Sequence, residues 1–344
     1  MLLLLLLMIP SGRLKAQNAE EDVNVNELVF GHIGDAYEWH IATLGETSIS
    51  IPLPVIVKSS TGWHVFSASK LEEGEYEGLY IAKSGANEGK IVERDASGEE
   101  VRPFDISITK NVLGLFINSA LLVIIMMSCV RWYKKHPVEQ GAPKGGVGMI
   151  EALVLMIYED VIKGCIGEDY RRYAPYLLTA FFFVLINNLM GLVPIFPGGA
   201  NVTGNIAITL VLAVCTFIFT NVYGTKEYWK EIFWPEVPVW LKVPVPMMPL
   251  IEFFGIFTKP FALMIRLFAN IMAGHAAILS LVAIIFITVK AGAAINGSMT
   301  FVAVAFGIFM DALEVLVAFI QAYVFTMLSA VFIGLSRVKG HETK

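Results

Sequence analysis

The chain has 344 residues, of which 56% are hydrophobic and only 16% are charged, and its mean hydropathy is +0.66. An ordinary soluble domain carries more charge and less apolar surface, so these values indicate a membrane protein. The formal net charge of -5 averages two unlike regions, because residues 17 to 110 hold a large excess of acidic side chains and the rest is net positive. The basic residues lie beside apolar runs and form no continuous stripe, so nucleic acid is excluded as an expected partner.

The N-terminal third of the chain divides into a leader and a polar domain. Residues 1 to 16 hold a long apolar run and end in a small residue, as a signal peptide does. Residues 17 to 108 combine Gly, Ser and acidic residues with short alternating stretches, such as Ser48 to Val57, that predict β-strands. We therefore expect a signal peptide at 1–16 and a small exported β-containing domain at 17–108, followed by a membrane domain at 109–344.

Residues that could ligate a metal occur in two settings. The exported segment contains His32, Asp35, Glu38 and His40, but their spacing matches no defined metal site, and a polar surface loop is the preferred interpretation. All three cysteines lie in or beside apolar stretches and are interpreted as small hydrophobic residues: Cys129, Cys165 and Cys215. No metal and no other cofactor is expected.

Five apolar stretches long enough to cross a bilayer core, which takes about 20 residues, follow the polar domain: Asn111 to Val130, Pro175 to Phe196, Asn205 to Tyr223, Met247 to Val289, and Met299 to Val338. The last two exceed one perpendicular crossing, so we expect strong tilt or a kink at Pro260. The stretch Met149 to Cys165 is too charged to span and is expected along the membrane surface. The sequence thus predicts an all-α polytopic membrane domain of about five transmembrane helices with a long, tilted C-terminal helical hairpin.

The basic residues that flank these spans indicate orientation. They fall on one side of the predicted membrane, and in the connection after the third span they are interspersed with tryptophans, as at a membrane interface: Arg131, Lys134, Lys135, Arg171, Arg172, Lys226, Lys230 and Lys242, with Trp229, Trp234 and Trp240. Since basic residues accumulate on the cytoplasmic side, we expect a multi-pass protein of the cell inner membrane with a periplasmic N-terminal domain and a cytoplasmic C-terminus. No phosphate-binding loop occurs, so no nucleotide is expected to bind.

A few polar residues interrupt the two longest apolar segments. Arg266, Asn270 and His275 lie in the first, and Asp311, Glu314 and Gln321 lie in the second. An ionisable group at membrane depth costs about 2.5–3.5 kcal/mol on insertion scales, so each is a candidate functional residue with a partner to be found. For Asp311, function and solvation in the wetter half of the helix are equally plausible.

An antiparallel hairpin of the two segments would place His275 level with Glu314 and Arg266 level with Gln321. On an ideal helix Glu314 and Gln321 share a face, whereas Arg266 and His275 point to opposite sides. We therefore expect Arg266 to face something outside the chain. His275 and Glu314 are expected to form a proton relay, because both groups exchange protons near neutral pH once their pKa values shift. An interhelical hydrogen bond without transport remains the alternative, and Asn270 and Gln321 could serve only helix packing.

The stretch Lys259 to His275, which reads KPFALMIRLFANIMAGH, resembles the signature of F-type ATP synthase a subunits. Asn187 to Pro194, Asn201 to Asn205, and Glu314 with Ile320 to Phe325 also resemble that family, and the resemblance covers about residues 111 to 338. It implies that Arg266 is the stator arginine and that His275, Glu314, Asn270 and Gln321 line a half-channel. Many bacterial members carry the acid and the imidazole exchanged between the positions of His275 and Glu314, and some carry an acidic residue where Gly191 stands.

The resemblance implies a subunit that is not an enzyme on its own. Protons would enter through one half-channel, ride a c-ring carboxylate around the rotor, and leave through a second half-channel, so that proton flow drives ATP synthesis. The implied partners are the c-ring, b-type stator subunits and the lipid bilayer. Two other classes stay open from the residues: a secondary transporter, which would need paired halves with matching interrupted helices, and an intramembrane hydrolase, for which neither HExxH nor GxSxG is present.

Overall fold

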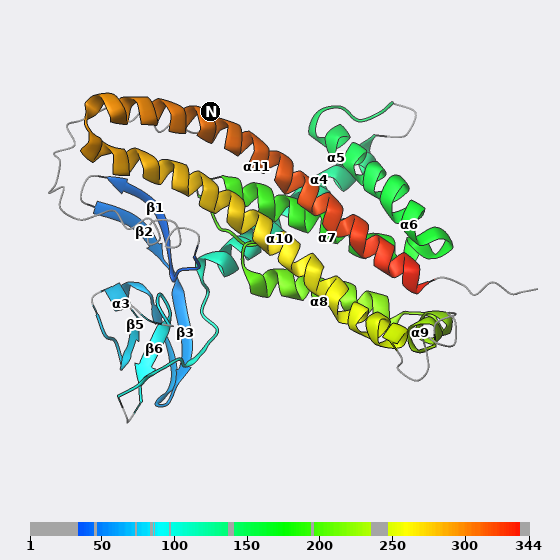
Figure 1. The fold of residues 1–344 in the computed structure, drawn as a ribbon, viewed down its shortest axis with the longest axis horizontal. Helices are drawn as coiled ribbons and strands as arrows, with labels where there is room; N and C mark the ends of the chain where they lie inside the picture. The colour runs from blue at the N-terminus through cyan, green and yellow to red at the C-terminus, as the bar shows by residue number, and fades with distance from the viewer. Residues whose placement is uncertain are drawn as a thin grey trace, which may run out of the picture.

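The computed structural model describes residues 34–44, 47–72, 74–82, 85, 87–95, 98–136, 141–193, 196–234 and 247–337. Within them a β-rich N-terminal region precedes a helical bundle (Figure 1). The predicted signal peptide at 1–16, the candidate ligand His32, the interfacial Trp240 and Lys242, and the chain after Arg337 lie outside the described residues.

The N-terminal region contains three small antiparallel sheets. β1 (Glu38–Leu44) pairs with β2 (Thr47–Pro52), and β3 (Pro54–Ser59) lies between β4 (Gly62–Ser67) and β8 (Phe104–Asp105). After the short α3 (Ser69–Glu72), β6 (Ile91–Arg94) pairs with both β5 (Leu79–Ile81) and β7 (Glu100–Val101). The expectation of a β-containing region ahead of the helices is confirmed.

A compact core holds these sheets together. Val55 and Val57, two residues apart on β3, point to one face as strand geometry requires, and they pack with Phe66, Leu79 and Ile91. At the edge of this core the buried Tyr37 hydroxyl donates to Asp105 Oδ2 at 2.5 Å. Burial and this bond raise the pKa of Tyr37 well above its ordinary value.

Five helical segments follow, and they agree with the five predicted spans in number and order. They are α4 (Lys110–Lys135), α7 (Tyr170–Leu192), α8 (Ile206–Val222), α10 (Met247–Thr288) and α11 (Ala293–Ser336). Four continuous helical stretches in the described chain are long and apolar enough to cross a membrane, and α8 with α9 (Lys226–Phe233) makes a fifth candidate that is bent by 98°. Aromatic Trp229 and Trp234 lie exposed on and beside α9 next to Lys226 and Lys230.

The charged stretch after α4 is helical. It comprises α5 (Gly145–Leu155), a π-helix (Met156–Lys163), α6 (Gly164–Ile166) and a 3-10 turn (Gly167–Asp169) that leads into α7. Ile157, Val161 and Ile162 are buried in the bundle core, whereas Lys163 is exposed and pairs with Glu159 at 2.6 Å. The segment therefore has one apolar and one charged face. Its predicted place on the membrane surface stays a prediction.

The C-terminal hairpin is confirmed, with a shorter turn than expected. α10 runs without a break through Pro260, and α11 begins six residues before the predicted Met299. The connection is only a 3-10 turn (Val289–Ala291) and Gly292, whose φ of 99° suits a residue without a Cβ. Asn296 lies within the first turn of α11, and its Oδ1 accepts a hydrogen bond from Thr288 Oγ1 at 2.9 Å, which ties the two helix ends together.

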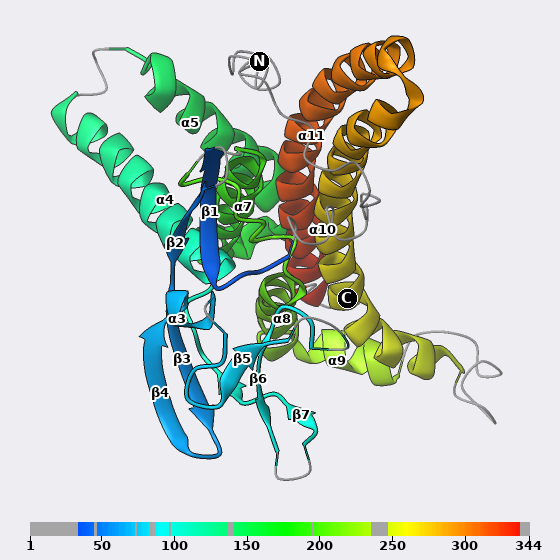
Figure 2. The same cartoon turned by 90° about the vertical axis from the view of Figure 1, so that its left-hand side faces the viewer.

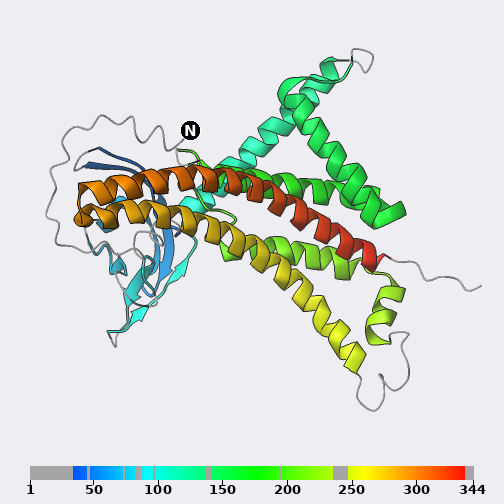
Figure 3. The same ribbon diagram turned by 45° about the horizontal axis from the view of Figure 1, so that its top comes forward.

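Figures 1 and 3 show α10 and α11 side by side near this turn and apart at their other ends. α7 packs on α11, and α8 packs on α10. α7 and α8 are consecutive and contact each other through the Tyr176 and Thr216 hydroxyls, 2.9 Å apart, so they form a helical hairpin. At Gly334 of α11 an added Cβ would meet the carbonyl oxygen of Cys165, which shows how closely α11 approaches α6. The β-rich region, the α7–α8 connection and the α10–α11 turn lie at one end of the bundle, as Figures 1 and 2 show together.

Candidate functional site

The two ionisable residues expected at equal depth meet in the structure. His275 Nδ1 on α10 lies 3.5 Å from Glu314 Oε1 on α11, and only 16% and 10% of the two side chains are exposed. This distance is within ion-pair range but longer than the roughly 2.7–3.2 Å of a direct hydrogen bond. The antiparallel register of α10 and α11 therefore brings one acid and one imidazole together inside the bundle.

A glycine makes this approach possible. An ideal Cβ added to Gly274 would collide with Glu314 Oε1, so the carboxylate lies directly against the backbone of α10. On the other side of the ring, an ideal Cβ on Gly191 of α7 would lie 3.8 Å from His275 Nε2 and 3.6 Å from the carbonyl oxygen of Ala200. The imidazole thus contacts Glu314 through one nitrogen and faces a small space beside Gly191 with the other.

Arg266 and Asn270 face away from this interior, as the helical geometry predicts. Both are exposed, and Arg266 makes no hydrogen bond or ion pair with any residue that the structure describes. The residues around them on the same surface of α10 are small and also exposed: Ala262, Ala269 and Ala273. One permanent cation therefore stands on a face that a neighbouring helix could approach closely.

Gln321 lies inside. Glu314, Ala318 and Gln321 are all buried and form one face of α11. The sequence alone could not show what lies opposite Ala318: Asn188 Nδ2 of α7 donates to the Ala318 carbonyl oxygen at 3.1 Å, and Thr203 Oγ1 donates to Asn188 Oδ1 at 2.7 Å. Asn188 and Thr203 are therefore site residues that the sequence did not identify, although both lie in stretches that resemble the family.

This polar network continues to α4. Asn118 Nδ2 donates to Asn187 Oδ1 at 3.0 Å, and both side chains are buried. Interhelical hydrogen bonds of this kind contribute about 0.6 kcal/mol on average in membrane proteins, so they set geometry more than stability. Polar contacts thus join α4, α7, α11 and the α7–α8 connection, and the contact with α11 lies one helical turn from Glu314.

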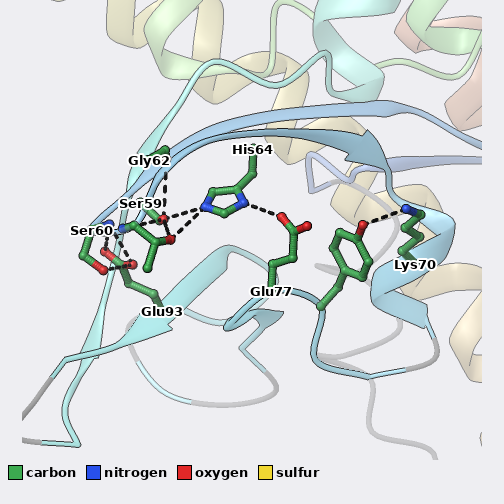
Figure 4. Close-up of polar contacts among 9 residues, drawn as sticks. Ser59, Ser60, Gly62, His64, Lys70, Glu77 and Glu93 are labelled. Carbon is green, nitrogen blue, oxygen red and sulfur yellow. Dashed lines mark hydrogen bonds and ion pairs between the residues drawn. The ribbon is translucent and has the colours of Figure 1, made fainter.

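A second polar cluster lies in the β-rich region (Figure 4). His64 Nδ1 pairs with Glu77, and His64 Nε2 lies 2.9 Å from both Ser59 Oγ and Thr61 Oγ1. This order resembles a serine, histidine and acid triad. However, Ser59 Oγ also accepts from the Thr61 amide at 3.1 Å, so its bonds close the β3–β4 turn, and we assign the cluster a structural role.

Of the four candidate metal ligands, Asp35 and Glu38 have side chains that the structure describes. Asp35 Oδ1 accepts from the Asn111 amide at 3.0 Å, which caps the start of α4. No group of three or more His, Cys, Asp or Glu side chains in the described chain is arranged to hold a metal ion. The structure therefore gives Asp35 a helix-capping role.

Both family models and known proteins match this chain. The family model described as ATP synthase A chain matches residues 114–334, and a model described as a domain of unknown function matches residues 28–109. The chain is 47% identical over 244 residues to ATP synthase subunit a of Chlorobium phaeobacteroides, covering 70% of this chain and 67% of that protein. It is 40% identical over 272 residues to ATP synthase subunit a of Myxococcus xanthus, covering 76% and 83%.

A multi-pass helical protein with a buried acid and imidazole pair, and an arginine on an outer helix face at membrane depth, is a membrane protein built to move ions. The chain belongs to the ATP synthase A chain family, as the match over 114–334 and these relatives show. The resemblance found in the sequence is confirmed. Neither a separate secondary transporter nor an intramembrane hydrolase is needed to explain the residues.

The contact between Gly274 and Glu314 generates a first prediction. Gly274→Ala should displace the Glu314 carboxylate from His275 while the fold persists, because the colliding atom is the free end of a flexible side chain. We expect proton-driven ATP synthesis in membrane vesicles to fall by about tenfold, since a small displacement of a reacting group is costly. Gly255→Ala is the matched control on the same helix, because its Cβ would meet only Lys259 Cε at 3.8 Å. Equal synthesis rates in the two variants would contradict the close packing at Gly274.

Proposed function

We propose that this chain is the membrane stator subunit of an F-type ATP synthase and conducts protons through two half-channels to and from the c-ring. The observation that carries the proposal is the position of Arg266, a permanent cation on the exposed face of α10. If that face met lipid, the guanidinium would cost about 2.5–3.5 kcal/mol. A partner carboxylate in the membrane removes this cost, and the essential carboxylate of each c-ring subunit is such a group in this family.

Arg266 cannot itself carry protons, because a guanidinium stays protonated in proteins. Its proposed role is electrostatic: it favours the ionised form of the ring carboxylate and so drives proton release on the exit side. It also blocks direct passage between the two half-channels. The small exposed residues Ala262, Ala269 and Ala273 support this role, because they let a ring helix approach Arg266 closely.

His275 and Glu314 are proposed to transfer protons toward the c-ring within the entry half-channel. Their 3.5 Å separation suits transfer through a small rearrangement or one intervening water. Gln321, buried two turns along α11 from Glu314, and Asn270, exposed one turn from Arg266, are proposed to line the path between this pair and the ring carboxylate. Both are amides, which offer donors and acceptors but no charge.

The remaining parts of the proposal concern organisation. We place a signal peptide at 1–16, an exported domain at 17–108 and the membrane domain at 109–344, with the N-terminal domain periplasmic and the C-terminus cytoplasmic. The chain would bind b-type stator subunits as well as the c-ring and would bind no nucleotide. The basic last turn of α4, with Lys134 and Lys135, and the basic α9 support this orientation, because α9 and the C-terminal end of α4 lie away from the β-rich region (Figures 1 and 3).

Replacing the cation tests the central role. Arg266→Ala should abolish ATP synthesis in vesicles and open a passive proton leak, because nothing would then separate the half-channels. The measurement is the collapse of an imposed proton gradient together with the synthesis rate. Lys259→Ala is the matched control, since Lys259 is an exposed cation on nearly the same face of α10, seven residues earlier, and it should stay close to wild type. ATP-driven proton pumping at the wild-type rate in Arg266→Ala would refute the proposal.

Exchange of the pair tests the relay. His275→Glu and Glu314→His should each lower proton-driven ATP synthesis by about a hundredfold, because each leaves two like groups together and shifts their pKa values. The double exchange restores one acid and one imidazole and should recover a measurable part of the rate, which a double-mutant cycle isolates as coupling. A double variant no better than the worse single variant would mean that the two residues do not act as one relay.

Protease accessibility tests the orientation. In cells with a permeabilised outer membrane, added protease should remove residues 17 to 108, because the basic clusters place the opposite ends of the helices in the cytoplasm. A tag fused after Lys344 should survive the same treatment and serves as the control. Full protection of the N-terminal domain, or loss of the tag, would reverse the proposed topology.

A further inference from the structure

The β-rich region is joined to the membrane bundle by one large aromatic side chain. Trp39 on β1 is only 3% exposed, and it is buried against Ala200 and Val202 of the α7–α8 connection. Its ring also packs edge-on against Phe196, with ring centroids 5.2 Å apart. Burial of a tryptophan is among the largest apolar contributions one residue can make. The N-terminal region and this connection are therefore held together at Trp39.

The segment that Trp39 contacts, residues 200–203, is unusual for a connection between helices. All four of its residues are at most 6% exposed, whereas connecting segments normally run over the surface. α4 closes it from a second side, because an ideal Cβ on Gly114 would meet Ala200 Cβ, Val202 Cγ2 at 3.4 Å and the Trp39 ring at 3.8 Å. Residues 200–203 are thus enclosed between the β-rich region and the bundle.

The other side of residues 200–203 faces the candidate site. Thr203 donates to Asn188, which in turn donates to α11 one turn from Glu314. The Ala200 carbonyl oxygen and His275 Nε2 flank the same small space beside Gly191. Asn201 Nδ2 also contacts Met272 Sδ of α10 at 3.6 Å. One short segment therefore touches Trp39 on one side and the surroundings of the relay on the other.

The contact with Trp39 is anchored at the start of α4. The Lys110 amide donates to the Ala36 carbonyl oxygen at 2.8 Å, and Asp35 caps the Asn111 amide. These bonds hold the chain just before β1 against the first turn of α4. The position of Trp39 is therefore set both by β1, on which it lies, and by the neighbouring α4.

We propose that the N-terminal domain is a clamp on the proton entrance, in which Trp39 is a positioning residue that presses residues 200–203 against Asn188 and the space beside His275 Nε2. This rests on the proposed function of the His275–Glu314 pair. The clamp limits solvent to one narrow route to the imidazole and keeps Thr203 bonded to Asn188. In this proposal, residues 28–109, which match a domain of unknown function, help to control proton entry.

Labelling of His275 in the intact ATP synthase tests the clamp without requiring proton transport. Diethyl pyrocarbonate acylates accessible, unprotonated imidazole nitrogens, and mass spectrometry reads each histidine separately. Trp39→Ala should raise the labelling rate of His275 severalfold and leave that of His136, at the far end of α4, unchanged. Passive proton conduction by vesicles stripped of the ATPase sector should fall by about tenfold, because the segment that positions the entrance is loosened.

Two further variants complete the design. Trp39→Phe keeps an aromatic ring in the contact and should restore most of the labelling protection and conduction. Trp63→Ala is the matched control, because Trp63 lies in the same region but is 56% exposed, and it should behave as wild type. If Trp39→Ala does not accumulate in the complex, Val202→Ala removes less volume from the same contact and should raise His275 labelling in the same way.

The outcomes separate the clamp from the proposed function. Unchanged His275 labelling in Trp39→Ala overturns the clamp even if Arg266→Ala behaves as a stator variant should. Raised His275 labelling with unchanged proton conduction would show that the clamp plays no part in proton entry. Raised labelling supports the clamp as a cover over His275 even if the pair exchange shows that His275 and Glu314 are no relay, because labelling reports solvent access alone.

Discussion

The register of α10 against α11 is the constraint on which the rest of the structure depends. An ionisable side chain in a membrane needs a partner or water, and His275 can reach Glu314 only if the two helices are aligned to within about one residue. The short turn at Gly292 and the bond between Thr288 and Asn296 set that alignment. Gly274 then allows the carboxylate to lie against the α10 backbone. A turn far from the pair thus determines whether acid and imidazole meet.

The helical period lets α10 present side chains to two different environments. His275 lies nine residues after Arg266, which is two and a half turns, so the two side chains point to opposite sides of α10. One side is buried against α7 and α11, and the other is exposed with small residues around the cation. The separation of a buried acid and imidazole pair from an outward permanent cation follows from helix geometry, without any break in α10.

The N-terminal region extends this argument beyond the membrane helices. Its core is complete in itself, with Val55, Val57 and Leu79 fully buried, so Trp39 is not needed to fill it. The indole is buried instead against the α7–α8 connection, where it encloses backbone that would otherwise be solvated. Enclosed backbone and amide groups must find hydrogen-bond partners, and Thr203, Asn188 and the Ala318 carbonyl oxygen provide them for one another.

Much of this protein could be predicted from the sequence, because membrane helices depend on local composition. The number and order of the spans, the C-terminal hairpin, the meeting of His275 with Glu314 and the outward direction of Arg266 all follow from apolar length and the helical period. The gap of residues 290–298 between the last two predicted spans was too broad, since α11 already begins at Ala293. Only the tertiary structure decided the contacts of Trp39, Asn188 and Thr203. Each joins residues far apart in the chain, and local pattern cannot distinguish a tryptophan in a domain contact or an asparagine in a polar network from ordinary packing residues.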